Sequence, residues 1–159
     1  MSADESVLRL LAGLLRTERI AHLATLRQRA PMASMTLYMA SPDFSAFHVH
    51  VSRLAWHTQD MEKSSRVALS VSQTDDRRED PFTLMRVTLR GEATRLENSG
   101  AEFEDLKRAW LARFPAQAVN FTLADFSFWR IAPADARFVA GYGAIHNLSA
   151  ADLRAASAA

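Results

Sequence analysis

Residues 47–71 read Phe47-His-Val-His-Val, then Ser52-Arg-Leu-Ala-Trp-His57-Thr58-Gln-Asp-Met-Glu-Lys-Ser-Ser, then Arg66-Val-Ala-Leu-Ser-Val. Alternating apolar residues bracket about ten helix-compatible residues, which predicts a strand, a polar turn opening a short helix, and a second strand. The free N–H groups and positive dipole end of a helix's first turn favour a phosphate. Side chains that can donate hydrogen bonds cluster at this turn, namely Ser52, Arg53, His57 and Thr58. The stretch therefore predicts an anion site, and the alternative is a polar surface turn without a ligand.

Length and composition limit the class of protein. The 159 residues suffice for a single domain, residues 1–159, that buries about two-thirds of its unfolded surface. Cysteine is absent, which excludes disulfides, thiolate metal sites and a cysteine nucleophile, and fits a reducing cytoplasm. The N-terminus does not resemble a secretory signal, and no apolar run reaches membrane-spanning length. We expect a cytoplasmic protein with no membrane partner.

Charge and motifs exclude further classes. Nineteen basic and eighteen acidic residues leave a formal charge of +1, with the two signs interspersed, so a nucleic-acid partner is not expected. The charged segment 74–81 reads as a solvated loop that indicates no particular partner. The sequence contains no Gly-x-Gly-x-x-Gly segment and no nucleophile elbow, which argues against a Rossmann domain and a hydrolase.

Hydrophobic periodicity predicts a mainly β protein with flanking helices, an α+β fold. Helices are expected at residues 2–18, where Ser2 and Glu5 have capping-box spacing, and from Asn98 to Arg113, where apolar residues form one stripe. A last short helix begins near Ser149, and the tail is expected to fray after residue 153. Six or seven strands joined mostly by short turns predict an antiparallel barrel. The expected strands span residues 20–26, 32–39, 46–51, 66–71, 82–96, 126–131 and 136–142, with a turn at 132–135.

Gly91 interrupts the longest predicted strand. Glycine inside a strand commonly marks a bulge or bend. Val87, Leu89 and Ala93 are spaced to form the inward row of this strand. Long strands that bend at glycine are typical of small closed barrels.

Two histidines, His48 and His50, lie two residues apart and therefore on one face of a predicted strand. Such a pair could bind a metal, but no third His, Asp or Glu stands at a recognisable spacing. We therefore expect no metal site and an exposed or dimer-facing strand.

Five segments occur in a recognisable order along the chain: Ile20-Ala-His-Leu-Ala-Thr-Leu, Pro31-Met-Ala-Ser-Met, Ser52-Arg-Leu-Ala-Trp-His-Thr, Leu84-Met-Arg-Val-Thr-Leu-Arg-Gly-Glu-Ala and Asp125-Phe-Ser-Phe-Trp-Arg-Ile-Ala-Pro. Together they resemble the FMN-binding split barrels related to pyridoxamine 5′-phosphate oxidase. The haem-utilisation branch of that group also shares Arg137-Phe-Val-Ala-Gly-Tyr-Gly and Leu148-Ser-Ala-Ala-Asp-Leu. The resemblance covers residues 5–153 and implies a six- to seven-stranded antiparallel split β-barrel.

The resemblance also implies a cofactor site. In the flavin-binding members FMN lies in a groove at a homodimer interface, so a homodimer is implied here. One strand would line the isoalloxazine with backbone groups, the polar turn would hold the ribityl phosphate, and Arg86 stands where these proteins often have glutamine near the ring. A cation there would stabilise reduced anionic flavin. The implied FMN-binding residues are Ser34, Met35, Thr36, Val51, Ser52, Arg53, His57, Thr58 and Arg86.

The implied activity is FMN-dependent oxidoreduction with a small-molecule electron donor or acceptor that the sequence does not identify. The oxidase itself recognises pyridoxal phosphate with an Arg-x-His element, and here Ala144-Ile145-His146 lacks the arginine, so vitamin B6 oxidation is not expected. The alternative is haem binding. Haem-utilisation relatives take an axial histidine from a C-terminal segment, whereas His146 is the last histidine here and becomes the candidate ligand. A cofactor-free interaction module is the third reading.

Overall fold

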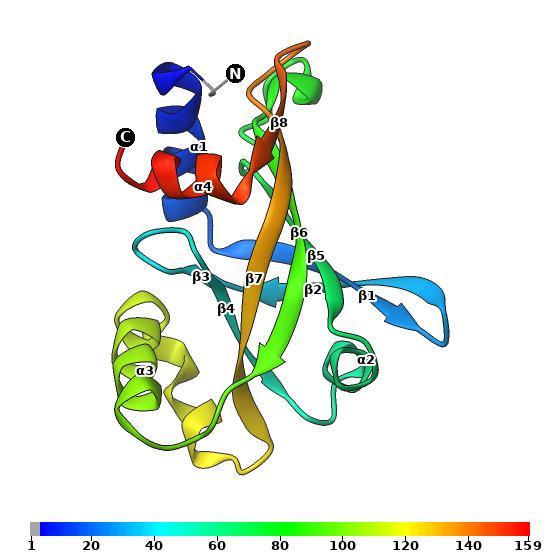
Figure 1. The fold of residues 1–159 in the computed structure, drawn as a ribbon, viewed down its shortest axis with the longest axis vertical. Coiled ribbons are helices and arrows are strands. Elements are labelled where there is room, and N and C mark those ends of the chain that lie inside the picture. The colour runs from blue at the N-terminus through cyan, green and yellow to red at the C-terminus, as the bar shows by residue number, and fades with distance from the viewer. Residues whose placement is uncertain (1–3) are drawn as a thin grey trace.

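The computed structural model describes residues 4–159 and shows an antiparallel sheet curled into a half-open barrel with helices around it (Figure 1). This confirms the predicted fold class. The strands are β1 (Ile20–Arg27), β2 (Ala30–Leu37), β3 (Met39–Ala40), β4 (Phe47–Ser52), β5 (Arg66–Ser72), β6 (Arg86–Arg95), β7 (Phe126–Val139) and β8 (Ile145–Ser149). The α-helices are α1 (Glu5–Thr17), α2 (Trp56–Lys63), α3 (Ala101–Arg113) and α4 (Ala150–Ser157), with 3-10 helices η1 (Pro81–Thr83) and η2 (Pro115–Thr122).

The barrel is open between β2 and β4. The strand order is β2-β1-β5-β6-β7-β4-β3, with β8 added to β7. β3 continues the chain from β2 and pairs with β4 over two residues only, one of them Met39 opposite His48. The same register would place Thr36 opposite Val51, but no such pairing occurs within residues 4–159. We call this opening between β2 and β4 the split.

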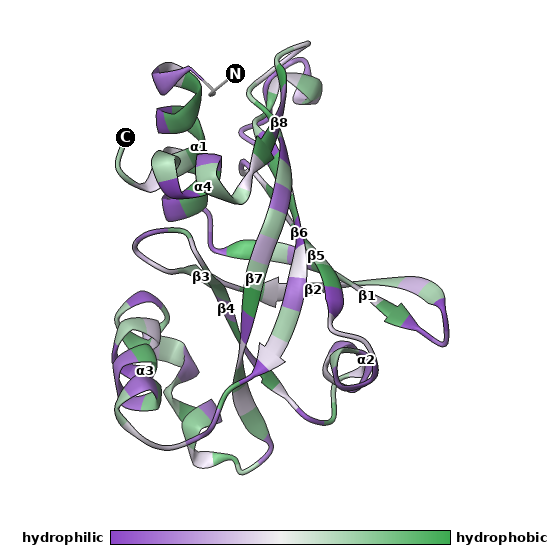
Figure 2. Ribbon diagram, in the orientation of Figure 1, coloured by the Kyte–Doolittle hydropathy of each residue, from purple (hydrophilic) through white to green (hydrophobic). Residues whose placement is uncertain are grey.

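Alternation along the strands separates a buried inner face from an outer face. Leu23, Leu69 and Leu89 are fully buried in neighbouring strands, and their outward neighbours are half-buried or exposed. The predicted inward row of β6, formed by Val87, Leu89 and Ala93, is confirmed, since all are at most 5% exposed. The same alternation of hydrophilic and hydrophobic residues is visible along β6 and β7 in Figure 2.

The predicted irregularity at Gly91 is present. The register between β6 and β7 shifts between Arg90 and Gly91, so that Gly91 pairs with Pro133 and Ala134 is left over. A Cβ on Gly91 would lie 2.1 Å from the carbonyl oxygen of Ala132, so only glycine fits. The expected turn at 132–135 is wrong, because this bulge takes up the extra residue and β7 continues from Phe126 to Val139.

Some helix ends differ from the predictions, because the residues predicted to cap them do not do so. The Asp4 side chain caps α1 by accepting from the Ser6 amide, and the predicted capping residue Ser2 lies outside the described residues. Asn98 does not cap α3, because its side-chain amide donates to the Phe126 carbonyl. The tail does not fray after residue 153, since α4 packs against α1 (Figure 1) and fully buries Ala156. None of the described helices is long and apolar enough to cross a membrane.

Candidate functional site

The polar turn between β4 and α2 is held by Asp125, which lies 73 residues further along the chain. The Arg53 amide donates to the Asp125 carbonyl at 2.7 Å. The Ser52 hydroxyl donates to the Asp125 carboxylate and accepts from the Leu54 amide at 3.1 Å. Ser52 was predicted to help bind an anion, but its proton is already engaged by a carboxylate, and its role in the structure is to shape the turn.

The first turn of α2 carries two buried polar atoms that lack a hydrogen-bond partner within residues 4–159, His57 Nε2 and Thr58 Oγ1. Thr58 is 3% exposed. Burial lowers the pKa of His57, and the Asp60 carboxylate partly opposes that shift, so the imidazole is neutral at neutral pH. Buried polar groups without partners are costly unless a ligand or water meets them. These two residues therefore fit a hydrogen-bonding ligand such as a phosphate.

An ion pair that the sequence did not reveal fastens α2 to β1. The buried Asp60 carboxylate accepts from the Thr25 hydroxyl and from the Arg27 guanidinium, each at 2.9 Å. The same guanidinium lies 4.2 Å from the ring centroid of Trp56. These contacts position the start of α2, where the two partnerless polar atoms lie. The sequence carries no local signal for them because the bonded residues are more than 30 positions apart.

The two edges of the split carry most of the other predicted cofactor residues. Val51 and Ser52 end β4, while Ser34 and Thr36 lie on β2 with their side chains on the inner face, as their partners Leu23 and Ala21 do. α2 contacts β1 and β2 beside them. Met35 lies on the outer face and is 61% exposed. The structure thus gathers these residues around one opening.

Arg86 lies elsewhere on the sheet. It stands at the start of β6, opposite Ser72 and Val139, and its guanidinium donates to the carbonyls of Phe82 and Leu84 at 3.1 and 3.2 Å. Within one chain, therefore, Arg86 is not part of the split.

Arg53, in the turn itself, has an exposed side chain that forms no ion pair or hydrogen bond in the described chain.

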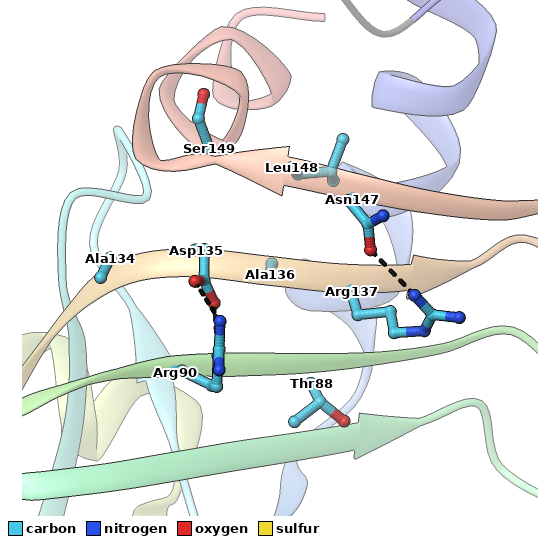
Figure 3. A pocket seen from close by; sticks show the side chains of 9 residues that line it. All are labelled: Thr88, Arg90, Ala134, Asp135, Ala136, Arg137, Asn147, Leu148 and Ser149. Carbon is cyan, nitrogen blue, oxygen red and sulfur yellow. Dashed lines mark hydrogen bonds and ion pairs between the residues drawn. The ribbon is translucent and has the colours of Figure 1, made fainter.

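The outer face of β6, β7 and β8 holds a depression of about 780 Å³ (Figure 3). Arg90 and Asp135 form a fork of two hydrogen bonds at 2.8 and 2.6 Å, and this arginine lowers the pKa of the Asp135 carboxyl. Arg137 donates to the side-chain oxygen of Asn147 at 3.0 Å. These polar side chains bind one another across the strands, so the depression is an open polar surface and not a formed cofactor groove.

His48 and His50 are 5% and 8% exposed, so the expectation of an exposed or dimer-facing strand is wrong. α3 and η2 pack over this face of β4 and form a second core around Trp110. Burial lowers the pKa of both histidines to about 4, with the charge of Arg130 adding to the effect at His48. No group of three metal-ligating side chains occurs within residues 4–159.

His146, the candidate haem ligand, is half-buried on β8 opposite Phe138. The two ring centroids are 6.4 Å apart, so the imidazole packs on the barrel core. An axial ligand needs an accessible imidazole beside an apolar slot, and the conformation in this structure does not present one.

Comparisons with known proteins agree with this fold. A family model described as CREG, beta-barrel, matches residues 11–154. The non-canonical heme oxygenase HOZ, chloroplastic, of Arabidopsis thaliana is 32% identical over 111 residues, which are 70% of this chain and 32% of that protein. The chain thus spans about a third of the length of this curated relative.

Solved structures include haem-binding and flavin-binding proteins. A heme binding protein from Mycobacterium smegmatis superposes with a TM-score of 0.84 at 25% identity, covering 96% of this chain and 62% of that chain. A putative pyridoxamine 5′-phosphate oxidase from Listeria innocua gives 0.67 at 11% identity, covering 85% and 99%. An FAD-binding protein from Mesorhizobium loti gives 0.62 at 16% identity, covering 79% and 87%. The last two likenesses show the fold alone.

Proposed function

Because this chain belongs to the CREG β-barrel family, a split-barrel group, we propose that it is a flavoprotein that binds FMN at the split. The observation that carries the proposal is the pair of partnerless buried atoms on the first turn of α2, His57 Nε2 and Thr58 Oγ1. They lie with the free N–H groups of that turn, which together favour a phosphate.

Arg53 completes the phosphate site in this proposal. Its exposed guanidinium is the free cation beside the turn in the described chain, whereas Arg27 is already paired with Asp60. A phosphate near neutral pH carries nearly two negative charges, and a guanidinium can match two of its oxygens. The Asp125 carboxylate opposes anion binding, so Arg53 also offsets that charge.

The isoalloxazine would lie along the edges of the split. Ser34, Met35 and Thr36 pair only with β1, and Val51 pairs only with β7, so within residues 4–159 no ladder joins β2 to β4 across the split. Backbone groups that face the split are therefore available to a ligand. Bound flavin would supply hydride and electron transfer chemistry. The chain's own residues would orient the ring and keep water away from one side of it. This makes the protein an FMN-dependent oxidoreductase in our proposal.

A homodimer is the second part of the proposal. Three large apolar side chains of β1 and β2 are exposed on the outer face, Ile20 at 47%, Leu26 at 37% and Met35 at 61%. Between them Ala33, Ala24 and Ala68 lie in direct register across three strands, which leaves a shallow apolar surface. Such a surface is typical of a protein interface. Arg86, which its own chain holds away from the split, joins the flavin site only if a second copy supplies it.

Haem binding is the second candidate, and the relatives favour it. HOZ at 32% identity and the Mycobacterium smegmatis protein at 25% both carry haem in their names. In this chain the haem would need His146 to leave its contact with Phe138. Haem binding through His146 would thus require a change in the packing on Phe138, whereas FMN binding at the split would not.

Spectroscopic titration of the purified protein decides between them. With FMN we expect saturable quenching of flavin fluorescence and much weaker quenching with riboflavin, which lacks the phosphate. With hemin we expect a broad, weak Soret change that His146→Ala reduces further. A sharp Soret band together with equal affinities for FMN and riboflavin would replace the flavin proposal with the haem one.

A further inference from the structure

β4 is buried on both of its faces, by the barrel core on one side and by α3 and η2 on the other. Phe47, Val49 and Val51 point into the barrel core. His50 points the other way, beneath α3 and η2, and its ring is stacked on Phe121 with centroids 4.2 Å apart and planes 12° apart. The ring centroid of Phe128 lies 4.6 Å from that of His50. An imidazole in such apolar surroundings is unusual, because buried polar groups normally have hydrogen-bond partners.

His50 has no such partner. It is 8% exposed, and its buried Nδ1 finds no donor or acceptor among residues 4–159. Burial lowers its pKa to about 4, so at neutral pH the ring is uncharged and offers one N–H and one acceptor nitrogen. Neither ring nitrogen forms a hydrogen bond within residues 4–159.

A cavity of about 270 Å³ opens on this imidazole. Phe103, Phe121 and Phe126 supply aromatic walls. Asn98 and Asn120 also line it, and their NH₂ groups are already engaged by Phe126 and Gln117. Aromatic walls with a few placed polar groups are the usual composition of a small-molecule site.

The cavity carries one positive charge and no negative one. Lys107 lines it, with its ammonium 5.4 Å from the ring centroid of Phe121. No carboxylate lines this cavity, and Lys107 forms no ion pair within the described chain. The neighbouring Arg108, by contrast, is paired with Asp105. An anion would therefore find an uncompensated partner in Lys107, partly shielded from solvent.

We propose that this cavity is a second ligand site, separate from the split, that binds a small aromatic anion. The carboxylate or phenolate of the ligand pairs with Lys107, its ring packs among the phenylalanines, and the His50 imidazole forms a hydrogen bond with it. The volume of about 270 Å³ lies just below the range of ligand pockets, which span about 300–1,000 Å³, so a single ring fits and a flavin or a haem does not. The proposal does not depend on which cofactor occupies the split.

The test uses benzoate as the probe and benzamide as its uncharged analogue. Titration of the 159-residue chain, without added flavin or hemin, is followed by calorimetry and by NMR of the His50 and phenylalanine ring protons. We expect saturable binding of benzoate with ring shifts confined to His50, Phe103, Phe121 and Phe126, and at least tenfold weaker binding of benzamide. Lys107→Met should weaken benzoate binding about tenfold, and the matched Lys63→Met at the end of α2 should not.

His50→Phe keeps the aromatic volume and removes the ring nitrogens, so it should fold and bind benzoate more weakly than the wild type. The shift of the His50 signals provides a readout on the wild-type protein that needs no variant. The proposal is overturned if benzoate gives no saturable shift of these rings. It is equally overturned if benzamide binds as well as benzoate while Lys107→Met has no effect. FMN binding at the split is measured separately, so the two proposals fail independently.

Discussion

His57 and Thr58 show how hydrogen bonds within the fold decide which polar side chains of the turn are available to a ligand. Each has a buried polar atom without a partner in the described chain. Ser52, three residues before α2's N-cap, donates instead to Asp125. Within one short turn, His57 and Thr58 are thus available to a ligand, whereas Ser52 stabilises the turn.

His57→Ala should weaken FMN binding roughly tenfold to a hundredfold, because a charge-assisted hydrogen bond contributes about 1.5–3 kcal/mol. The pKa of His57 lies below its usual 6.5 in the free protein, and a bound phosphate dianion raises it. Affinity should therefore fall as the pH rises between these two pKa values. The FMN affinities of the wild type and of His57→Ala are measured by fluorescence titration at several pH values. The difference between the two proteins at each pH excludes the effect of protonation of the phosphate itself.

Arg53→Ala is the matched test for this slope. Guanidinium stays charged over this range, so the variant should weaken FMN binding by a similar factor at every pH and keep the wild-type slope. Riboflavin should be insensitive to both substitutions. If neither variant changes the FMN affinity, the phosphate does not bind at this turn.

His48 and His50 should make the protein less stable in mild acid. Their folded pKa values of about 4 lie below the unfolded value of about 6.5, so between these values the unfolded chain binds more protons. Each histidine then lowers the free energy of unfolding by up to about 1.4 kcal/mol per pH unit as pH falls. Their contribution is fully present above pH 6.5.

Urea unfolding at pH 4.5, 5.5 and 7 measures this slope. His48→Gln should reduce the slope and leave the contributions of His50 and of His57, whose pKa is also lowered by burial. Asp43, Asp76 and Asp135 have lowered carboxyl pKa values, so their contributions are lost only below about pH 4 and do not overlap this window. An unchanged slope in His48→Gln would mean that this imidazole is already protonated in the folded protein.

At the scale of elements, β6 and β7 are shaped by one glycine. The bulge at Gly91 lets β7 bend past β6 and continue to pair with β4, β6 and β8. α1 contains another glycine, Gly13, with no heavy atom within 4 Å of the Cβ position. The two sites give opposite expectations for the same substitution.

Gly91→Ala should lower the free energy of unfolding by about 1–3 kcal/mol or more, because its Cβ would overlap the Ala132 carbonyl oxygen. Gly13→Ala should raise it by about 0.5–1 kcal/mol, because alanine loses less entropy in a helix. Thermal or urea unfolding of both variants checks the pair. A neutral Gly91→Ala would show that the β6 to β7 ladder moves to accept the methyl group.

At the scale of the whole molecule, the sheet has an inner face covered by α1, α2, α4 and the barrel core, and an outer face that α3 and η2 cover at β4 but leave open along β1 and β2. The exposed apolar side chains of β1 and β2 lie on the open face, which also carries the polar depression of Figure 3. The proposed homodimer would cover part of this surface and place the split of each chain at or near the interface.

Met35→Asp should therefore convert a dimer to a monomer in light scattering at micromolar concentration, because it places a charge in an apolar interface. Val119→Asp on η2 is the matched control, since both residues are 61% exposed and only Met35 lies on the proposed interface. The wild type is expected to bury more than about 2,000 Å² as an obligate pair. A monomeric wild type would contradict the dimer and weaken the flavin site that depends on it.

Local patterns in the sequence were enough to predict most of the strands, the Gly91 bulge and the apolar stripe of α3, because periodicity and turn chemistry act over a few neighbouring residues. They missed β8 and divided β7 in two. The family was predicted from the resemblance of several segments in order. Local patterns also predicted the polar turn at Ser52 and the helix that follows it. The tertiary structure alone decided how that turn is used, since Asp125, which binds Ser52, lies 73 residues away. It likewise buried His48 and His50 under α3 and held Arg86 away from the split. Burial, pKa and the choice of partner depend on which distant segments pack together, and no local pattern records that.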